Sequence, residues 1–118
     1  MPVRRFEDLE VWKLAHRLAL QVYQVTDTFP TKEQFGLTSQ MRRSAVSIPA
    51  NIAEGFGRSG KGEKLQFYNI AQGSLSEVRY YFLLAKDLLY LTEIQAPLET
   101  CDSIGRMLHA MMTRTRER

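Results

Sequence analysis

The sequence predicts an all-α protein, an antiparallel up-down-up-down four-helix bundle. Seven glycines and four prolines are few for 118 residues, and they divide the chain into four long stretches. In each stretch apolar residues recur every three or four positions, which is the spacing of one helical face, and strand-like alternation is absent. The connections between the stretches are short, which favours antiparallel neighbours.

The composition predicts one domain over residues 1–118. The chain is 44% hydrophobic and 25% charged with a net charge of +3, which is typical of a globular protein and excludes disorder along most of the length. It has no apolar run long enough for a membrane span, and its start has no signal-peptide pattern. The single cysteine, Cys101, cannot form an intrachain disulfide, so we expect it to be buried in a cytoplasmic protein.

The first helix is predicted over about residues 8–28. Asp8 is its expected N-cap, and Phe29 followed by Pro30 ends it, because a residue before proline disfavours the helical conformation. The apolar face consists of Val11, Trp12, Ala15, Leu18, Ala19, Val22 and Val25.

The second helix is predicted over about residues 37–57. Pro49 lies inside its apolar pattern, where its ring would clash with the carbonyl of Ala45, so we expect a kink, with Ser47 able to cap the second half. Two separate short helices are the alternative. The apolar row consists of Leu37, Met41, Ala45, Ile48, Ile52 and Phe56.

The third helix, about residues 61–91, carries more apolar surface than one bundle needs. At about 100° per residue its apolar side chains spread over roughly 180°, whereas an amphipathic helix needs little more than about 100°. The excess predicts a second buried face. The fourth helix is predicted over about residues 93–114, where Thr92 and Gln95 match a capping box and Pro97 predicts a bend or a restart.

A polar stripe on the second helix is a candidate contact between copies of the chain. Its members follow spacings of four and three residues, from Gln40 to Arg58. A solvated face would explain it equally well, but short polar side chains also let helices approach and pair. Gly73, inside the third helix, indicates a second close approach unless it is a tolerated surface glycine. The predicted interface consists of Gln40, Ser44, Ser47, Asn51, Glu54, Gly73 and Ser74.

Residue patterns for catalysis are missing. His16 and His109 have no cysteine or carboxylate at metal-ligand spacing, and no Glu-x-x-His pair of a di-iron bundle occurs. The glycine-rich segment 55–62 lacks the Walker pattern and a preceding strand. We therefore expect no enzymatic activity, no cofactor and no metal.

Basic residues are predicted to gather at one end of the bundle, because the chain ends and the connection between the second and third helices meet there. They make up half of the 16 lysines and arginines, against four acidic residues nearby. Repetition around an oligomer axis would concentrate this charge, which favours RNA or DNA phosphates with little sequence preference. The set is Arg4, Arg5, Arg58, Lys61, Lys64, Arg114, Arg116 and Arg118.

Four segments resemble the bacterial four-helix-bundle proteins encoded in intervening sequences of 23S ribosomal RNA genes. They are FEDLEVWKLA from residue 6, the Phe-Pro of 29–30, QMRRSAVSIPANIAEG from residue 40, and AQGSLSE from residue 71. The resemblance covers nearly all of the chain up to about residue 91. It implies a left-handed bundle that assembles as a homopentamer around a central channel.

The same family is similar to the accessory variability protein of diversity-generating retroelements, which binds a reverse transcriptase and nucleic acid. One departure from the family pattern is the Val78-Arg79-Tyr80-Tyr81 run after Glu77, where an acidic residue is common. Our leading hypothesis is a non-enzymatic homo-oligomer that holds RNA or DNA at its basic end. The alternative is a protein-interaction scaffold that uses Tyr80, Tyr81 and Tyr90 to receive a protein partner.

Overall fold

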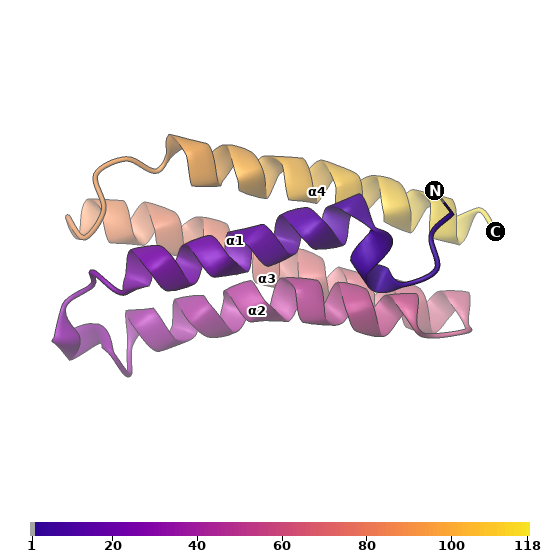
Figure 1. Cartoon of the computed structure of the whole chain (residues 1–118), viewed down its shortest axis with the longest axis horizontal. Helices are drawn as coiled ribbons and strands as arrows, with labels where there is room; N and C mark the ends of the chain where they lie inside the picture. Colours follow the sequence, from indigo (N-terminus) through magenta and orange to yellow (C-terminus); the bar gives the residue numbers. More distant parts are fainter. Residues whose placement is uncertain (1) are drawn as a thin grey trace.

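A computed structural model describes residues 2–118, and its four α-helices confirm the all-α fold class. The helices are α1 (Glu10–Thr26), α2 (Leu37–Phe56), α3 (Lys61–Asp87) and α4 (Gln95–Arg116), with short 3-10 helices η1 (Phe6–Asp8) and η2 (Thr31–Glu33). Both chain ends and the α2–α3 connection lie at one end of the molecule, and the other two connections lie at the opposite end (Figure 1). No strand occurs in residues 2–118.

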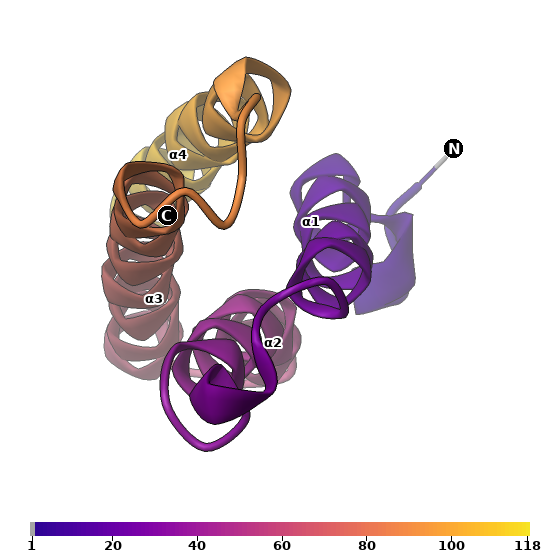
Figure 2. The ribbon, with the colours of Figure 1, turned by 90° about the vertical axis from the view of Figure 1, so that its left-hand side faces the viewer.

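The helices form a ring in sequence order. α1 packs against α2, α2 against α3, α3 against α4, and α4 returns to α1 (Figure 2). The molecule measures 46 × 25 × 21 Å, so it is an elongated rod.

The start of α1 differs from the prediction because Asp8 belongs to η1 instead of capping the helix. Its Oδ2 accepts hydrogen bonds from the backbone N–H groups of Arg4 (3.0 Å) and Arg5 (3.1 Å). These bonds hold the pKa of the Asp8 carboxyl below its usual value. Asp8 therefore orders the N-terminal segment, and α1 starts two residues later at Glu10.

α2 continues through Pro49, so the alternative of two short helices is wrong. Pro49 is buried, and Ser47 caps no second helix because its Oγ accepts hydrogen bonds from Asn51 and Ser74. Helical hydrogen bonds on both sides of the proline and its burial in the core outweigh the one bond that the ring removes.

The α3–α4 connection is longer than predicted. α3 ends at Asp87, and Leu89 takes the left-handed conformation with a φ of 66°, which a helix cannot contain. α4 starts at Gln95 without the expected capping box. Pro97 is its third residue, in the first turn, where no backbone N–H is needed for an intrahelical bond.

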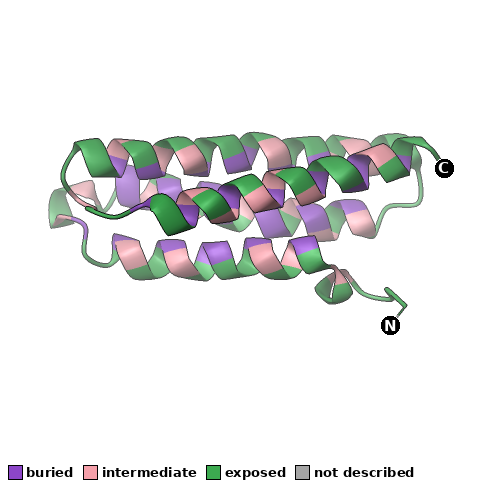
Figure 3. Cartoon of the chain, turned by 90° about the horizontal axis from the view of Figure 1, so that it is seen from above, coloured by how far each residue is buried: buried purple, intermediate pink, exposed green. Residues whose placement is uncertain are grey.

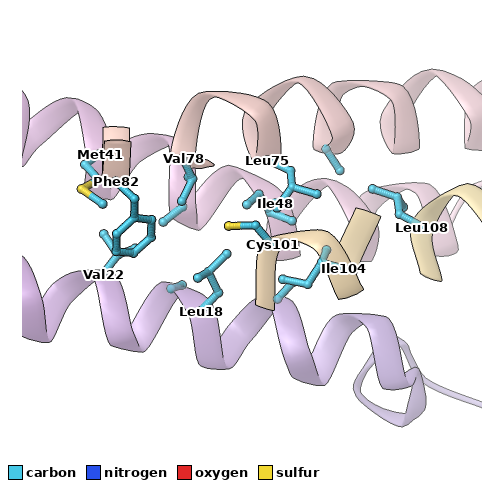
Figure 4. Packing of buried hydrophobic residues seen from close by; sticks show 14 of the residues in the cluster. Leu18, Val22, Met41, Ile48, Leu75, Val78, Phe82, Cys101, Ile104 and Leu108 are labelled. Carbon is cyan, nitrogen blue, oxygen red and sulfur yellow. The ribbon is translucent and has the colours of Figure 1, made fainter. Parts of the chain in front are cut away.

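The core runs the length of the rod and draws on all four helices. In Figure 4, Leu18 of α1, Ile48 of α2, Val78 of α3 and Ile104 of α4 converge on the bundle axis. Cys101 is buried there as predicted, and burial raises the pKa of its thiol to about 11, so the thiol remains protonated. The outer faces are mostly exposed (Figure 3).

The wide apolar arc of α3 is only partly used within the chain. Its inner residues are buried, but several large apolar side chains on its outer side remain exposed. These are Ile70, Tyr80 and Leu83. None of the helices in residues 2–118 is long and apolar enough to cross a membrane.

Candidate functional site

The basic end is assembled from three parts of the chain that are distant in sequence. The N-terminal segment, the α2–α3 connection and the last turn of α4 all lie at the same end of the rod (Figure 1). Lys61 donates hydrogen bonds from its Nζ to the backbone oxygens of Arg116 (3.3 Å) and Arg118, which joins two of these parts directly. The tertiary structure therefore gathers the eight basic residues predicted from the sequence.

Three of the eight residues have structural partners. Lys64 donates from its Nζ to the carbonyls of Gly55 (3.2 Å) and Phe56 (2.8 Å), which satisfies the last turn of α2 and complements its dipole. Lys61 donates in the same way to backbone oxygens at the C-terminal end of α4. Arg58 pairs with Glu54 at 3.1 Å and lies over the ring of Phe67 at 4.9 Å.

The other five residues are arginines with no carboxylate partner in the part of the chain that the structure describes. They are Arg4, Arg5, Arg114, Arg116 and Arg118. All five are exposed. This end therefore carries an excess of positive charge, which is what a phosphate-binding surface needs.

A cavity of about 460 Å³ opens at the basic end and includes a residue that sequence reasoning missed. Lys64, Tyr68, Arg114 and Arg118 line it together with apolar side chains such as Phe56 and Met111. Tyr68 lies on the inner face of α3 and is 2% exposed. Its position in the helical pattern predicts core packing, and only the tertiary structure shows that its ring reaches a cavity lined by cations.

The polar stripe joins α2 to α3 within one chain at its centre. Ser74 donates a hydrogen bond from its Oγ to the Oγ of Ser47 at 2.8 Å. The side chain of Asn51 donates from its Nδ2 to the backbone oxygen (2.8 Å) and to the Oγ (2.9 Å) of Ser47. Ser44 is buried, whereas Gln40 and Glu54 are exposed. The stripe thus lies at the edge of the α2–α3 contact, and its outer members, Gln40 and Glu54, are exposed to solvent in the single chain.

The two helical glycines of interest have opposite surroundings. A Cβ on Gly73 would meet nothing within 4 Å, so the close approach that we expected there is absent within the chain. A Cβ on Gly55 would lie 2.5 Å from Cε1 of Tyr68, so the close approach of α2 and α3 occurs there. Sequence reasoning placed Gly55 near the end of the second helix, at the start of the glycine-rich segment 55–62, and predicted no close approach there.

The aromatic residues of the scaffold alternative are not equivalent. Tyr80 is 56% exposed and Tyr81 is half-buried. Tyr90 donates a hydrogen bond from its hydroxyl to Glu33 Oε2 at 2.8 Å and packs on Phe29, so it holds two connections together. Within residues 2–118, no three His, Cys, Asp or Glu side chains are placed to hold a metal ion.

Comparison with known proteins identifies the family. The sequence profile of the 23S rRNA-intervening sequence proteins matches residues 7–110. The chain belongs to this family. The comparison with curated proteins found no match.

A solved structure has the same fold. It is a protein of unknown function from the S23 ribosomal protein family of Bacteroides thetaiotaomicron VPI-5482, 22% identical, with a TM-score of 0.79. The match covers 87% of this chain and 95% of the relative. At this identity the likeness shows a shared four-helix fold.

Proposed function

We propose that this 23S rRNA-intervening sequence protein is a non-enzymatic homo-oligomer that binds the phosphates of RNA or DNA at its basic end. The observation that carries the proposal is the gathering of eight basic residues at one end, five of them arginines without a carboxylate partner within residues 2–118. Binding of this kind releases counterions and has little sequence preference. The cytoplasmic location expected from the sequence is part of the same proposal.

Self-association is supported by apolar side chains that the single chain leaves uncovered. On α3, Ile70 is 45% and Tyr80 56% exposed, and Gly73 between them presents bare backbone. The exposed members of the polar stripe, Gln40 and Glu54, lie on the adjoining α2. We infer that copies pack through these sides of α2 and α3. Five copies, as the family resemblance implies, would bring five basic ends together around one axis.

The binding test is the salt dependence of affinity for a single-stranded RNA of arbitrary sequence, measured by fluorescence anisotropy. We expect a linear fall of log K with log salt. Replacing Arg114, Arg116 and Arg118 with Gln should reduce the magnitude of this slope by about 2 per subunit contacting RNA, at roughly 0.7 for each lost phosphate contact.

The matched control removes the same charge from the opposite end. Lys32, Arg43 and Lys86 are exposed and lie towards the end that holds the α1–α2 and α3–α4 connections. Their replacement with Gln should leave the slope close to that of the wild type. Equal effects of the two triple variants would mean that net charge alone governs binding, and affinity indifferent to salt would remove nucleic acid from the proposal.

The protein-interaction scaffold remains the second candidate because Tyr80 is exposed beside Leu83 on α3. Aromatic and aliphatic side chains together are typical of the core of a protein interface. A native mass of one 13.6 kDa subunit, with this surface bound to a different protein after nuclease treatment, would favour the scaffold over self-association.

A further inference from the structure

The cavity at the basic end has the chemistry of an anion site. Its lining contains three cationic side chains, those of Lys64, Arg114 and Arg118, and no carboxylate. Arg114 and Arg118 make no side-chain hydrogen bond or ion pair within residues 2–118. Like charges around one cavity repel each other, so an anion bound between them would be stabilised by all three.

The ammonium group of Lys64 has more N–H donors than the backbone carbonyls that accept from it. An ammonium group has three N–H donors, and the carbonyls of Gly55 and Phe56 accept from Lys64 Nζ. The third N–H is available to the cavity. Burial, and then the nearby Arg118, lower the pKa of Lys64.

Tyr68 adds a neutral donor. It is 2% exposed, and within residues 2–118 its hydroxyl has no hydrogen-bond partner. No fully enclosed side-chain polar atom in residues 2–118 lacks a partner, so the Tyr68 oxygen must open on the cavity that its side chain lines. Burial raises the pKa of this hydroxyl, and it therefore remains a proton donor for a bound oxyanion.

We propose that this cavity binds a phosphate monoester, with Arg114, Arg118, the third N–H of Lys64 and the Tyr68 hydroxyl as donors to its oxygens. A monoester presents three free oxygens and carries up to two negative charges, whereas a backbone diester has two free oxygens, carries one negative charge and is flanked by two sugars. A volume of about 460 Å³ suits one nucleotide-sized group. Phe56 and Met111 provide apolar contact for the attached sugar or base.

This inference deepens the proposed function, since the end of a nucleic-acid strand is the source of monoester that the basic end would meet. The test compares one fluorescent RNA with a 5′-phosphate and the same RNA with a 5′-hydroxyl. We expect about tenfold tighter binding of the phosphorylated strand, the effect of one or two charge-assisted hydrogen bonds. Tyr68→Phe should reduce this preference several-fold and leave the affinity for the 5′-hydroxyl strand unchanged.

Arginine variants distinguish binding in the cavity from the general attraction of the basic end for RNA. The double variant Arg114→Gln, Arg118→Gln should abolish the preference for the phosphate. Arg116→Gln is the matched control because Arg116 lies between them in sequence and does not line the cavity. This variant should bind both RNA strands more weakly by the same factor, so the ratio of the two affinities should stay at the wild-type value. Thermal unfolding of each variant verifies that it is folded.

Adenosine monophosphate and inorganic phosphate are added in a second arm, with thermal stabilisation of the protein as the readout. One outcome is that these ligands stabilise the wild type but not the double variant, while neither protein binds RNA. This outcome would support the cavity as a site for a free phosphate ester and would contradict the proposed function. RNA binding that ignores the 5′-phosphate in the wild type would overturn the cavity inference and leave the proposed function intact. Absence of both effects would overturn both.

Discussion

Gly55 of α2 and Tyr68 of α3 touch so closely that a Cβ atom on Gly55 would lie 2.5 Å from Cε1 of the tyrosine ring. The added Cβ would also lie 3.2 Å from the backbone oxygen of Lys64, so α3 meets Gly55 with backbone as well as with the tyrosine ring. The missing side chain at residue 55 leaves room for the ring of Tyr68, a residue that lines the cavity. A packing detail and a candidate binding group are therefore coupled.

We predict that Gly55→Ala destabilises the protein by about 1–3 kcal/mol, the usual cost of an added methyl group in a closely packed position. The free energy of unfolding in urea measures the effect. Gly62→Ala is the control, because a Cβ on Gly62 meets nothing within 4 Å. It should be neutral or slightly stabilising. An unchanged Gly55→Ala variant would mean that α2 and α3 are not as close as described.

Gly73→Ala tests whether α3 packs against another copy. Within one chain the added methyl group points into open space, and alanine favours a helix interior over glycine by about 1 kcal/mol. If a second copy covers Gly73, the methyl group should raise the dissociation constant of the oligomer several-fold in sedimentation over a dilution series. Unaltered assembly together with a higher melting temperature would remove Gly73 from the interface.

Asn51→Leu tests the polar stripe at its centre. The change removes both hydrogen bonds to Ser47, so we expect a loss of about 1–2 kcal/mol in unfolding free energy. We also expect weaker assembly, measured as native mass against concentration. Gln24→Leu on the exposed side of α1 is the control for added apolar surface. Destabilisation with assembly intact would confine Asn51 to the packing of α2 on α3.

The Glu33 carboxylate predicts an acid-sensitive contact at the end opposite the basic residues. Its Oε1 accepts from the Leu37 backbone N–H at 3.1 Å and its Oε2 from the Tyr90 hydroxyl. These bonds, the backbone bond first, lower its pKa from the ordinary 4.5. The stability that they contribute is therefore complete above pH 4.5 and is lost as the pH falls through the lower folded-state pKa.

Glu33→Gln should remove this acid sensitivity. Between about pH 5 and about pH 3 the wild type should lose more stability than the variant, as measured by urea unfolding at each pH. Tyr90→Phe should retain part of the acid slope, since Leu37 still donates. Parallel pH profiles for all three proteins would show that Glu33 is not bonded in this way.

The Pro97 and Asp8 positions show where local reasoning reaches its limit. Pro97 correctly indicates that the fourth helix begins nearby. The capping box predicted from Thr92 and Gln95, however, gives the wrong first residue for that helix. The left-handed Leu89 and the Glu93 carboxylate, which accepts from Gln95 N–H at 3.0 Å, set the start instead. Asp8 has the right residue type for an N-cap, yet its contacts run backwards to Arg4 and Arg5.

The helical periodicity alone determined that the chain is a four-helix protein, most of the residues that form its core, and that the apolar arc of α3 is wider than the single chain covers. These properties depend on the spacing of side chains along single helices, which the order of residues contains. The tertiary structure decided that Gly55, not Gly73, makes the close approach, and that Tyr68 joins Lys64, Arg114 and Arg118 at one cavity. Such contacts depend on the distance and rotation between helices, which many packed side chains set together.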